Sequence, residues 1–326
     1  MARADLLMNI VRAGRRGDQA LFRKSVEALI AEERAKQHYV LADRLEENLR
    51  TNGSPSLEGP TFSDERMQNL LVDITPTRKL EDLLLPELVK MSCQELIEEH
   101  HRCELLRSHN LEPRSRVLLV GPPGNGKTSL AEALSEALMV PLLVVRYEGV
   151  IGSYLGETAN RLRKLFDHVR TRRCVLFFDE FETLGKERGD IHETGEIKRV
   201  VSSLLLQMDA LPSHVLVITA SNHPELLDRA VWRRFQLRLL LPYPKGKQLT
   251  EWFRRFEKRI GEPLGYTPGY LADALAGLSF AEVEDFCTDI HRCRVLAQPQ
   301  GDLKKIIHQR MKQWQARFRV PRPSRE

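Results

Sequence analysis

A glycine-rich turn between an apolar run and a helical pattern carries the most specific chemistry in this chain. The stretch RVLLVGPPGNGKT ends at Thr128 and places four residues between Gly121 and Gly126-Lys127-Thr128. This spacing is the phosphate-binding loop G-x-x-x-x-G-K-[ST], in the strand-to-helix setting that it requires. Glycines let backbone N–H groups surround phosphate oxygens, and the helix N-terminus adds partial positive charge. We therefore expect a nucleoside triphosphate to bind along Gly121, Pro122, Pro123, Gly124, Asn125, Gly126, Lys127 and Thr128.

Two acids after a second apolar run supply what hydrolysis of that nucleotide needs. Asp179 and Glu180 directly follow four apolar residues, VLFF. The end of a buried parallel strand lies at the sheet edge where ligands of open α/β sheets bind. We expect Lys127 to reach the β- and γ-phosphates, and Thr128 and Asp179 to hold Mg²⁺. Glu180 would orient and deprotonate the attacking water, so the expected cofactors are ATP and Mg²⁺.

Three further polar residues have two interpretations each. Asn222 ends the run VITASN, where it could contact the attacking water or the γ-phosphate, or could be an ordinary strand-end amide. Arg233 and Arg234 follow a short apolar helix pattern. They could be surface charges, or they could stabilise the transition state in a neighbouring subunit's site as arginine fingers.

Alternating periodicities predict the elements that position these residues. From residue 116 onward, strand-like runs alternate with helical ones; the strand-like runs are 117–120, 142–146, 174–178, 215–220 and 236–241. This alternation predicts an α/β fold with a parallel sheet and helices on both faces. Pro242-Tyr243-Pro244 ends the alternation, and the pattern is helical from about Gln248 to Arg317. A smaller all-α lid domain is therefore expected after the sheet.

The composition changes along the chain predict four parts. Residues 1–50 have helical periodicity and form an N-terminal segment, and residues 51–65, rich in glycine, proline and hydroxyl residues, form a linker. The large α/β domain spans 66–242, and the helical lid with its basic C-terminal helix spans 243–326. From Asp302 to the end there are eight Lys or Arg and two acids, a net charge of +6. This segment therefore carries more positive charge than the whole chain, whose net charge is +5.

Composition also limits the class of protein. The 326 residues are 42% hydrophobic and 29% charged, as in ordinary globular proteins. No apolar run approaches the roughly 18 residues of a membrane helix, and the N-terminus lacks the pattern of a secretory signal. The five cysteines are scattered, which favours reduced thiols. We expect a cytoplasmic protein with no membrane span.

Four motifs in order carry a family resemblance. GPPGNGKT, VLFFDE, VITASN and LDRAVWRRF resemble the AAA family of ATPases, over roughly residues 112–290. The Arg-Arg-Phe form resembles the group that includes katanin and spastin. The resemblance implies a nucleotide-dependent ring, usually a homohexamer, with ATP at each interface. It places Asn222 at the sensor position and Arg233 and Arg234 at fingers acting in trans.

The same resemblance implies a pore loop. Tyr154 matches the aromatic residue with which similar proteins grip a translocated polypeptide, and Leu155 matches the residue after it. An aromatic ring suits this task because it offers apolar contact to any side chain. The chain departs from the family at two places near the nucleotide. Asn125 replaces the commonest Thr of the loop, and Phe280 stands where Gly is usual in the segment of the lid that contacts the nucleotide.

The leading hypothesis is an ATP-hydrolysing ring motor that threads, unfolds or disassembles a protein substrate. An adaptor or substrate would bind through residues 1–50, and a separate protease partner stays open. One alternative is a nucleic-acid motor or loader that uses the basic C-terminal tail. Another is an ATP-gated scaffold with slow turnover.

Overall fold

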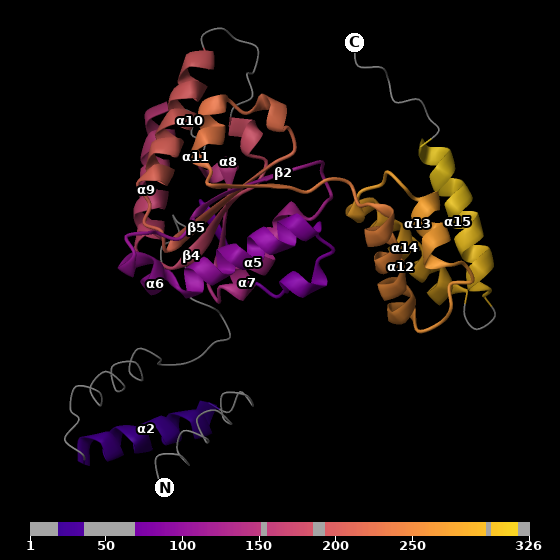
Figure 1. The fold of residues 1–326 in the computed structure, drawn as a ribbon, viewed down its shortest axis with the longest axis horizontal. Helices are drawn as coiled ribbons and strands as arrows, with labels where there is room; N and C mark the ends of the chain where they lie inside the picture. The colour runs from indigo at the N-terminus through magenta and orange to yellow at the C-terminus, as the bar shows by residue number, and fades with distance from the viewer. Residues whose placement is uncertain (1–18, 36–68, 151–154, 185–192, 298–300, 319–326) are drawn as a thin grey trace. The chain divides into compact units, whose positions relative to one another are not determined.

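The computed structural model describes residues 19–35, 69–150, 155–184, 193–297 and 301–318 (Figure 1). The chain divides into two compact units, residues 1–61 and 62–326. In the first unit the described element is α2 (Gln19–Ala35), on which Val26, Leu29 and Ile30 are buried. Their spacing marks one apolar face of a helix. The linker expected over residues 51–65 lies outside the described part.

A twisted six-stranded sheet lies at the centre of the second unit, as far as the described residues show. Its strands are β1 (Leu71–Ile74), β2 (Arg116–Val120), β3 (Leu142–Val145), β4 (Cys174–Phe178), β5 (Val215–Ser221) and β6 (Leu237–Leu240). The order is β1-β3-β4-β5-β2-β6, and every pairing is parallel except that of β1 with β3. The expected α/β sheet is thus confirmed. The sequence pattern does not reveal β1, because a four-residue run containing Asp73 has no clear periodicity.

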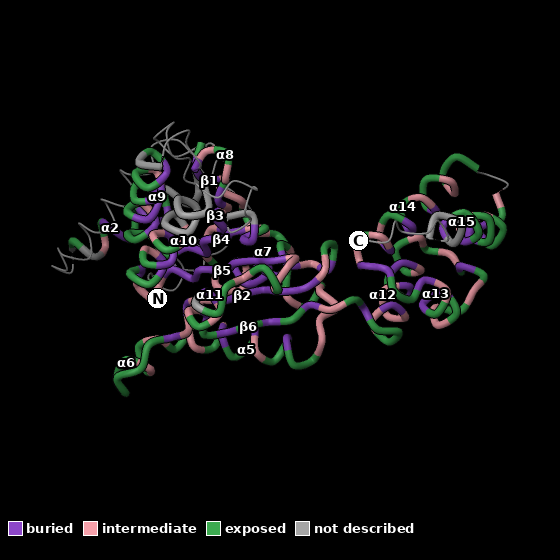
Figure 2. Tube along the Cα trace, turned by 90° about the horizontal axis from the view of Figure 1, so that it is seen from above, coloured by how far each residue is buried: buried purple, intermediate pink, exposed green. Residues whose placement is uncertain are grey.

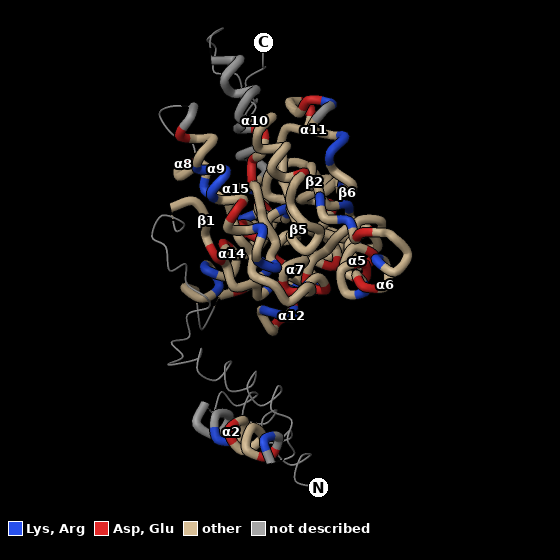
Figure 3. Tube along the Cα trace, turned by 90° about the vertical axis from the view of Figure 1, so that its left-hand side faces the viewer, with Lys and Arg blue, Asp and Glu red and all other residues tan. Residues whose placement is uncertain are grey.

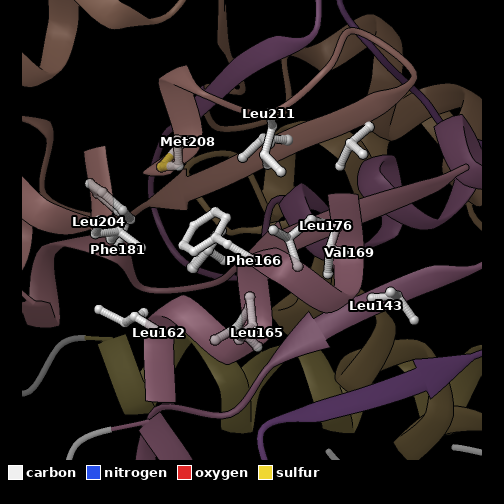
Figure 4. Close-up of a cluster of buried hydrophobic side chains, with 14 of the residues drawn as sticks. Leu143, Leu162, Leu165, Phe166, Val169, Leu176, Phe181, Leu204, Met208 and Leu211 are labelled. Carbon is white, nitrogen blue, oxygen red and sulfur yellow. The ribbon is translucent and has the colours of Figure 1, made fainter. Parts of the chain in front are cut away.

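Helices cover both faces of this sheet. On one face α5 (Glu87–His101) and α7 (Lys127–Ala137) pack on strand side chains such as Leu119 and Phe177. On the other, α9 (Leu155–Arg170) and α10 (Glu193–Asp209) pack on the alternate strand positions, with Phe166 near the middle of the cluster in Figure 4. Every residue of β4 and β5 is therefore buried, as Figure 2 shows along the strands. Parallel strands covered on both sides have this continuous burial.

Short elements complete the α/β part. They are the 3₁₀ turns η1 (Leu80–Asp82), η2 (Phe181–Leu184) and η3 (Pro224–Leu226), and the helices α6 (Cys103–Ser108), α8 (Tyr147–Val150) and α11 (Arg229–Arg234). The turns η2 and η3 come shortly after the ends of β4 and β5, with the polar residues Asp179, Glu180 and Asn222 lying between strand and turn.

Within the described ranges, four helices follow the sheet and form the expected smaller all-α part. They are α12 (Gly246–Ile260), α13 (Pro268–Ala274), α14 (Phe280–Leu296) and α15 (Leu303–Phe318). They share a core in which the Phe286 and Trp314 rings meet edge to face at 5.7 Å between centroids. The Ser279 hydroxyl accepts a hydrogen bond from the Glu282 N–H, and the Glu282 carboxylate accepts from the Ser279 N–H in return. This capping box fixes where α14 begins. None of the helices in the described residues has the length and hydropathy needed to cross a bilayer.

Candidate active site

The carboxyl ends of β2, β4 and β5 border one cavity of about 580 Å³. A cavity of this size is in the range of small-molecule sites. Nine of the residues expected from the sequence line it: Pro123, Gly124, Asn125, Gly126, Lys127, Thr128, Asp179, Glu180 and Asn222. The three strands are adjacent in the sheet, and this adjacency brings together residues that lie about a hundred positions apart in the chain.

The loop after β2 has a backbone that only glycine adopts easily. Gly121, Gly124 and Gly126 have φ angles of 150°, 76° and 82°. A Cβ on Gly121 would lie 2.1 Å from the Leu241 carbonyl oxygen, so the loop passes too close to the end of the sheet for any side chain. Such a glycine turn at a helix N-terminus leaves backbone N–H groups free to surround an anion.

Lys127 is the first residue of α7 and is buried, with 6% of its surface exposed. Its ammonium group donates hydrogen bonds to the carbonyl oxygens of Gly121 (2.7 Å) and Pro122 (2.9 Å). Burial lowers the pKa of Lys127, although the charges of Asp179 and Glu182 act in the opposite direction. A cation held inside its own loop in this way can neutralise a phosphate that enters the cavity.

Thr128 and Asp179 meet across the cavity floor. The Thr128 hydroxyl donates to Asp179 Oδ2 at 2.9 Å, and the Glu180 N–H donates to Asp179 Oδ1 at 2.9 Å. A hydroxyl and a carboxylate are hard oxygen donors of the kind that Mg²⁺ prefers. Glu180 has a φ of 46°, an uncommon angle for a residue with a side chain. Such strained backbone concentrates at functional sites.

Glu182 is a site residue that the sequence pattern did not single out. It is buried, with 3% of its surface exposed, and its Oε1 accepts the Asn222 N–H at 3.0 Å. Glu182 therefore holds the end of β5 in place beside the acids after β4. The third acid of the run DEFE was the available signal, but acids on short turns are usually exposed.

A buried tyrosine hydroxyl lies within electrostatic range of the three acids. Tyr147, on α8, has a buried hydroxyl without a hydrogen-bond partner among the described residues, as does Glu182 Oε2. Burial raises the pKa of Tyr147 well above its usual value, and the charges of Asp179, Glu182 and Glu180 raise it further. This phenol therefore stays neutral over the physiological range of pH.

The two arginines expected to complete the site lie outside the cavity lining. Arg234 forms an ion pair with Asp209 of α10, and Arg116 also approaches Asp209, at 3.7 Å. Arg233 is exposed. The chain's own cavity thus brings together the loop, the acids and Asn222 but neither arginine.

The expected pore-loop residues are placed only in part. Tyr154 lies outside the described residues, and Leu155 is the first residue of α9. The preceding helix α8 and the following α9 bracket the segment between them.

The lid forms the other wall of the cavity. The Ala281 N–H donates to the Gly124 carbonyl at 3.0 Å, and the Phe280 N–H donates to Asn125 Oδ1 at 3.3 Å. A Cβ on Gly124 would lie 2.9 Å from Ala281 Cβ and 2.9 Å from Ser279 Oγ. The phosphate-binding loop and the N-terminus of α14 are therefore in direct contact.

Several lid and lead-in residues that line the cavity carry no motif and were not expected from the sequence. They are Leu83, Leu84, Leu85, Pro86, Gln248 and Trp252. Only the folded arrangement brings them to the loop. Most of them, like Phe280, add apolar side chains to the cavity lining.

The residues present fit a magnesium nucleotide. The glycine turn and Lys127 would receive phosphates, and the pair Thr128 and Asp179 would hold the metal. Glu180, next to Asp179 and exposed in the cavity, is placed to accept a proton from water. The arrangement can carry out hydrolysis of a phosphoanhydride.

Comparisons with known proteins agree with this chemistry. Residues 117–243 match the model of the family described as "ATPase family associated with various cellular activities (AAA)". An uncharacterised AAA family ATPase of Sinorhizobium fredii is 35% identical over 302 residues, which cover 91% of this chain and 90% of that protein. A cell division cycle protein 48 homolog of Archaeoglobus fulgidus is 32% identical, over 74% of this chain and 34% of that protein. Peroxisomal ATPase pex6 of Schizosaccharomyces pombe is 31% identical, over 63% of this chain and 24% of that protein. The chain thus spans nearly all of the first relative but about a third and a quarter of the other two.

Proposed function

The chain belongs to the AAA family of ATPases and is an ATP-hydrolysing enzyme, and from this premise we propose that it is a ring motor that remodels a protein substrate. ATP binds in the cavity beside the loop Gly121–Thr128, with Mg²⁺ held by Thr128 and Asp179. Bound Mg²⁺ supplies charge neutralisation of the phosphates. Lys127 releases its loop carbonyls to contact the β- and γ-phosphates.

Hydrolysis depends on Glu180 in this proposal. Its carboxylate takes a proton from the attacking water, and Asn222, held through its N–H by Glu182, orients that water or the γ-phosphate. The single observation that carries the proposed chemistry is the 2.9 Å contact of Thr128 with Asp179, beside Glu180 in one cavity with the loop.

The site is completed by a second copy of the chain. Arg233 and Arg234 lie outside their own cavity lining, and a neighbouring subunit in a ring would use them to stabilise charge in the transition state. Arg233, which is exposed, is free to reach such a site directly. Arg234 would act on the neighbouring site while it stays paired with Asp209 of its own chain. We propose that the ring is a homohexamer that forms when nucleotide is bound. The Arg-Arg-Phe sequence supports a place near katanin and spastin within the family.

A protein substrate is the best-supported cargo. The relatives include a cell division cycle protein 48 homolog, a peroxisomal ATPase and a putative 26S proteasome regulatory subunit homolog. We propose that Tyr154 and Leu155 line a central pore and grip the polypeptide. Residues 1–50 would receive an adaptor or the substrate, in the cytoplasm, and a protease partner acting on the product is compatible with this role.

Nucleic acid is a weaker candidate because three of the basic side chains on α15 have partners within the chain. On α15, Arg310 pairs with Asp289, Lys305 with Asp302, and Lys304 lies over the Tyr266 ring. Acidic residues also lie beside basic ones around α5 and α6, as Figure 3 shows. Such mixed charge does not favour a phosphate backbone.

Stimulated turnover tests the proposed cargo. An unfolded protein should raise the rate of phosphate release by the wild-type chain, whereas single- or double-stranded DNA should not. Tyr154→Ala should keep basal turnover and lose the stimulation. Tyr243→Ala, which removes an exposed tyrosine at another place in the chain, is the control. Stimulation by DNA alone, or a fully stimulated Tyr154→Ala variant, would contradict the proposal.

A further inference from the structure

Three polar residues form a row along the carboxyl edge of the sheet. Tyr147 follows the end of β3, Glu182 follows the end of β4, and Asn222 directly follows β5. These three strands are neighbours, in the order β3-β4-β5. Glu182 Oε1 accepts the Asn222 N–H at 3.0 Å, so two members of the row are in contact. Tyr147, the third member, has no part in the hydrolysis proposed above.

Two buried polar atoms of this row lack a hydrogen-bond partner among the described residues. They are the Tyr147 hydroxyl and Glu182 Oε2. Leaving either group unpaired away from water costs free energy, and folded proteins pair nearly all such groups. The two groups are complementary, because a neutral phenol donates a hydrogen bond and a carboxylate oxygen accepts one.

The phenol of Tyr147 keeps the proton that it would donate. Burial raises the pKa of Tyr147 well above its usual value, so the hydroxyl stays neutral. The charge of Glu182 also raises this pKa, which places the two groups within electrostatic range of each other. A rotation of the Glu182 carboxylate, or one water molecule between the two groups, would complete a hydrogen bond.

The contact with Asn222 uses only one of the two carboxylate oxygens of Glu182. The side chain is 3% exposed and lies on the short turn η2. With one oxygen bonded, the carboxylate can still rotate about its last side-chain bond, which has a broad preference. A hydrogen bond at Oε2 would fix the plane of the carboxylate, and with it the position of the Asn222 N–H. Asn222 lines the cavity, so its position bears on the chemistry there.

The ring of Tyr147 is held by apolar contacts that do not involve its hydroxyl. It packs against the hydrophobic cluster that contains Phe166 and Phe181, which Figure 4 shows. A fixed ring gives its hydroxyl a fixed position, so little conformational freedom is lost when that hydroxyl forms a hydrogen bond. Phenylalanine would fill the same space, and only the hydroxyl distinguishes the two residues.

We propose that Tyr147 is a positioning residue for ATP hydrolysis: its hydroxyl donates to Glu182 Oε2, directly or through one water molecule, and so fixes the carboxylate that holds Asn222. Tyr147 is not among the residues that line the cavity, so it acts through Glu182 rather than on the nucleotide. The inference rests on the proposed function in one respect, which is that Asn222 orients the attacking water or the γ-phosphate.

Tyr147→Phe tests this role because it removes the hydroxyl and keeps the ring. The kcat for phosphate release should fall by about 3- to 10-fold, as expected for one lost hydrogen bond. The KM for ATP and the affinity for ADP in titration calorimetry should stay near those of wild type, because the phosphate-binding loop and Asp179 are unchanged. Tyr270→Phe, at an exposed tyrosine of the lid, is the matched control and should change none of these quantities.

A double-mutant cycle with Glu182→Ala shows whether the hydroxyl acts through Glu182. In the Glu182→Ala background, Tyr147→Phe should lower kcat by less than about 2-fold. Urea unfolding of the same four proteins without nucleotide gives a second cycle. Tyr147→Phe should lower the free energy of unfolding when Glu182 is present and have little effect when it is absent.

Three outcomes would overturn the proposal. A Tyr147→Phe variant with the kcat of wild type would show that the hydroxyl has no role in hydrolysis. Equal losses of kcat with and without Glu182 would show that it acts through another group. Parallel losses of kcat and ADP affinity would show a general disturbance of the cavity. The first and third outcomes need only Tyr147→Phe, so they remain decisive if Glu182→Ala does not fold.

Failure of the proposed function would give a different result. A wild-type chain without ATP turnover would remove that function, and the positioning role of Tyr147 with it. The unfolding cycle needs no nucleotide and would still show whether Tyr147 and Glu182 are in contact.

Discussion

Gly124→Ala perturbs the contact between the phosphate-binding loop and the lid. Gly124 has a φ of 76°, and its carbonyl accepts the Ala281 N–H at 3.0 Å. An added Cβ would lie 2.9 Å from both Ala281 Cβ and Ser279 Oγ. Neither atom can move away freely, because Ser279 caps α14 and Ala281 is in its first turn.

The expected cost has two parts. Placing alanine in the left-handed region costs about 1–2 kcal/mol. Forcing a methyl group into an occupied contact costs about 1–3 kcal/mol more. The sum, about 2–5 kcal/mol, should appear as a lower free energy of unfolding. The affinity for ADP should fall as well, because the lid wall of the cavity is displaced.

Urea unfolding and ADP titration of the full chain measure the two effects, and Gly261→Ala is the matched control. Gly261 has a φ of 78°, and a Cβ there would meet nothing within 4 Å. It should lose about 1–2 kcal/mol through the backbone alone and keep its ADP affinity. If Gly124→Ala were no less stable than Gly261→Ala and bound ADP normally, the contact between loop and lid would not exist in solution.

Two further predictions concern other charged groups of the α/β part. Asp209→Asn should lower the free energy of unfolding by about 1 kcal/mol, because it leaves Arg234 and Arg116 without their shared carboxylate. In an Arg234→Gln background the loss should be smaller, and equal losses would show that the ion pair contributes nothing. Burial lowers the pKa of His100 below its usual 6.5. As the pH falls, His100 therefore binds a proton in the unfolded chain before it does so in the folded chain. The free energy of unfolding should consequently decrease below about pH 6.5. His100→Gln should reduce that decrease in urea unfolding between about pH 7.5 and pH 5.5, and an unchanged pH dependence would exclude His100 as its source.

The part of the site that the sequence predicts is local in the chain. The loop after β2 and the acids after β4 each follow a buried apolar run, so the motif and the strand that positions it are read together. The five parallel strands could be predicted for the same reason. The order of the strands, which the sequence pattern does not give, places β5 between β4 and β2, and Thr128 and Asp179 meet there.

The part that the sequence does not predict depends on contacts distant in the chain. Trp252 lies on an amphipathic helix, where an aromatic residue usually indicates a core position. Only the docking of α12 and α14 places it beside the loop. Glu182 was missed because its burial depends on accepting the Asn222 N–H, a contact across 40 positions. The strand β1 is visible only through its pairing with β3.

Phosphate release by Glu180→Gln tests the central claim most directly. The variant keeps the loop, Lys127 and the pair Thr128 and Asp179, so it should bind ATP with an affinity near that of wild type. Without the carboxylate that accepts a proton from water, turnover should fall by about 10²- to 10⁴-fold. The control Glu148→Gln, which removes an exposed carboxylate outside the cavity lining, should turn over normally. Turnover of Glu180→Gln at the wild-type rate would contradict the account of this cavity as the site of hydrolysis.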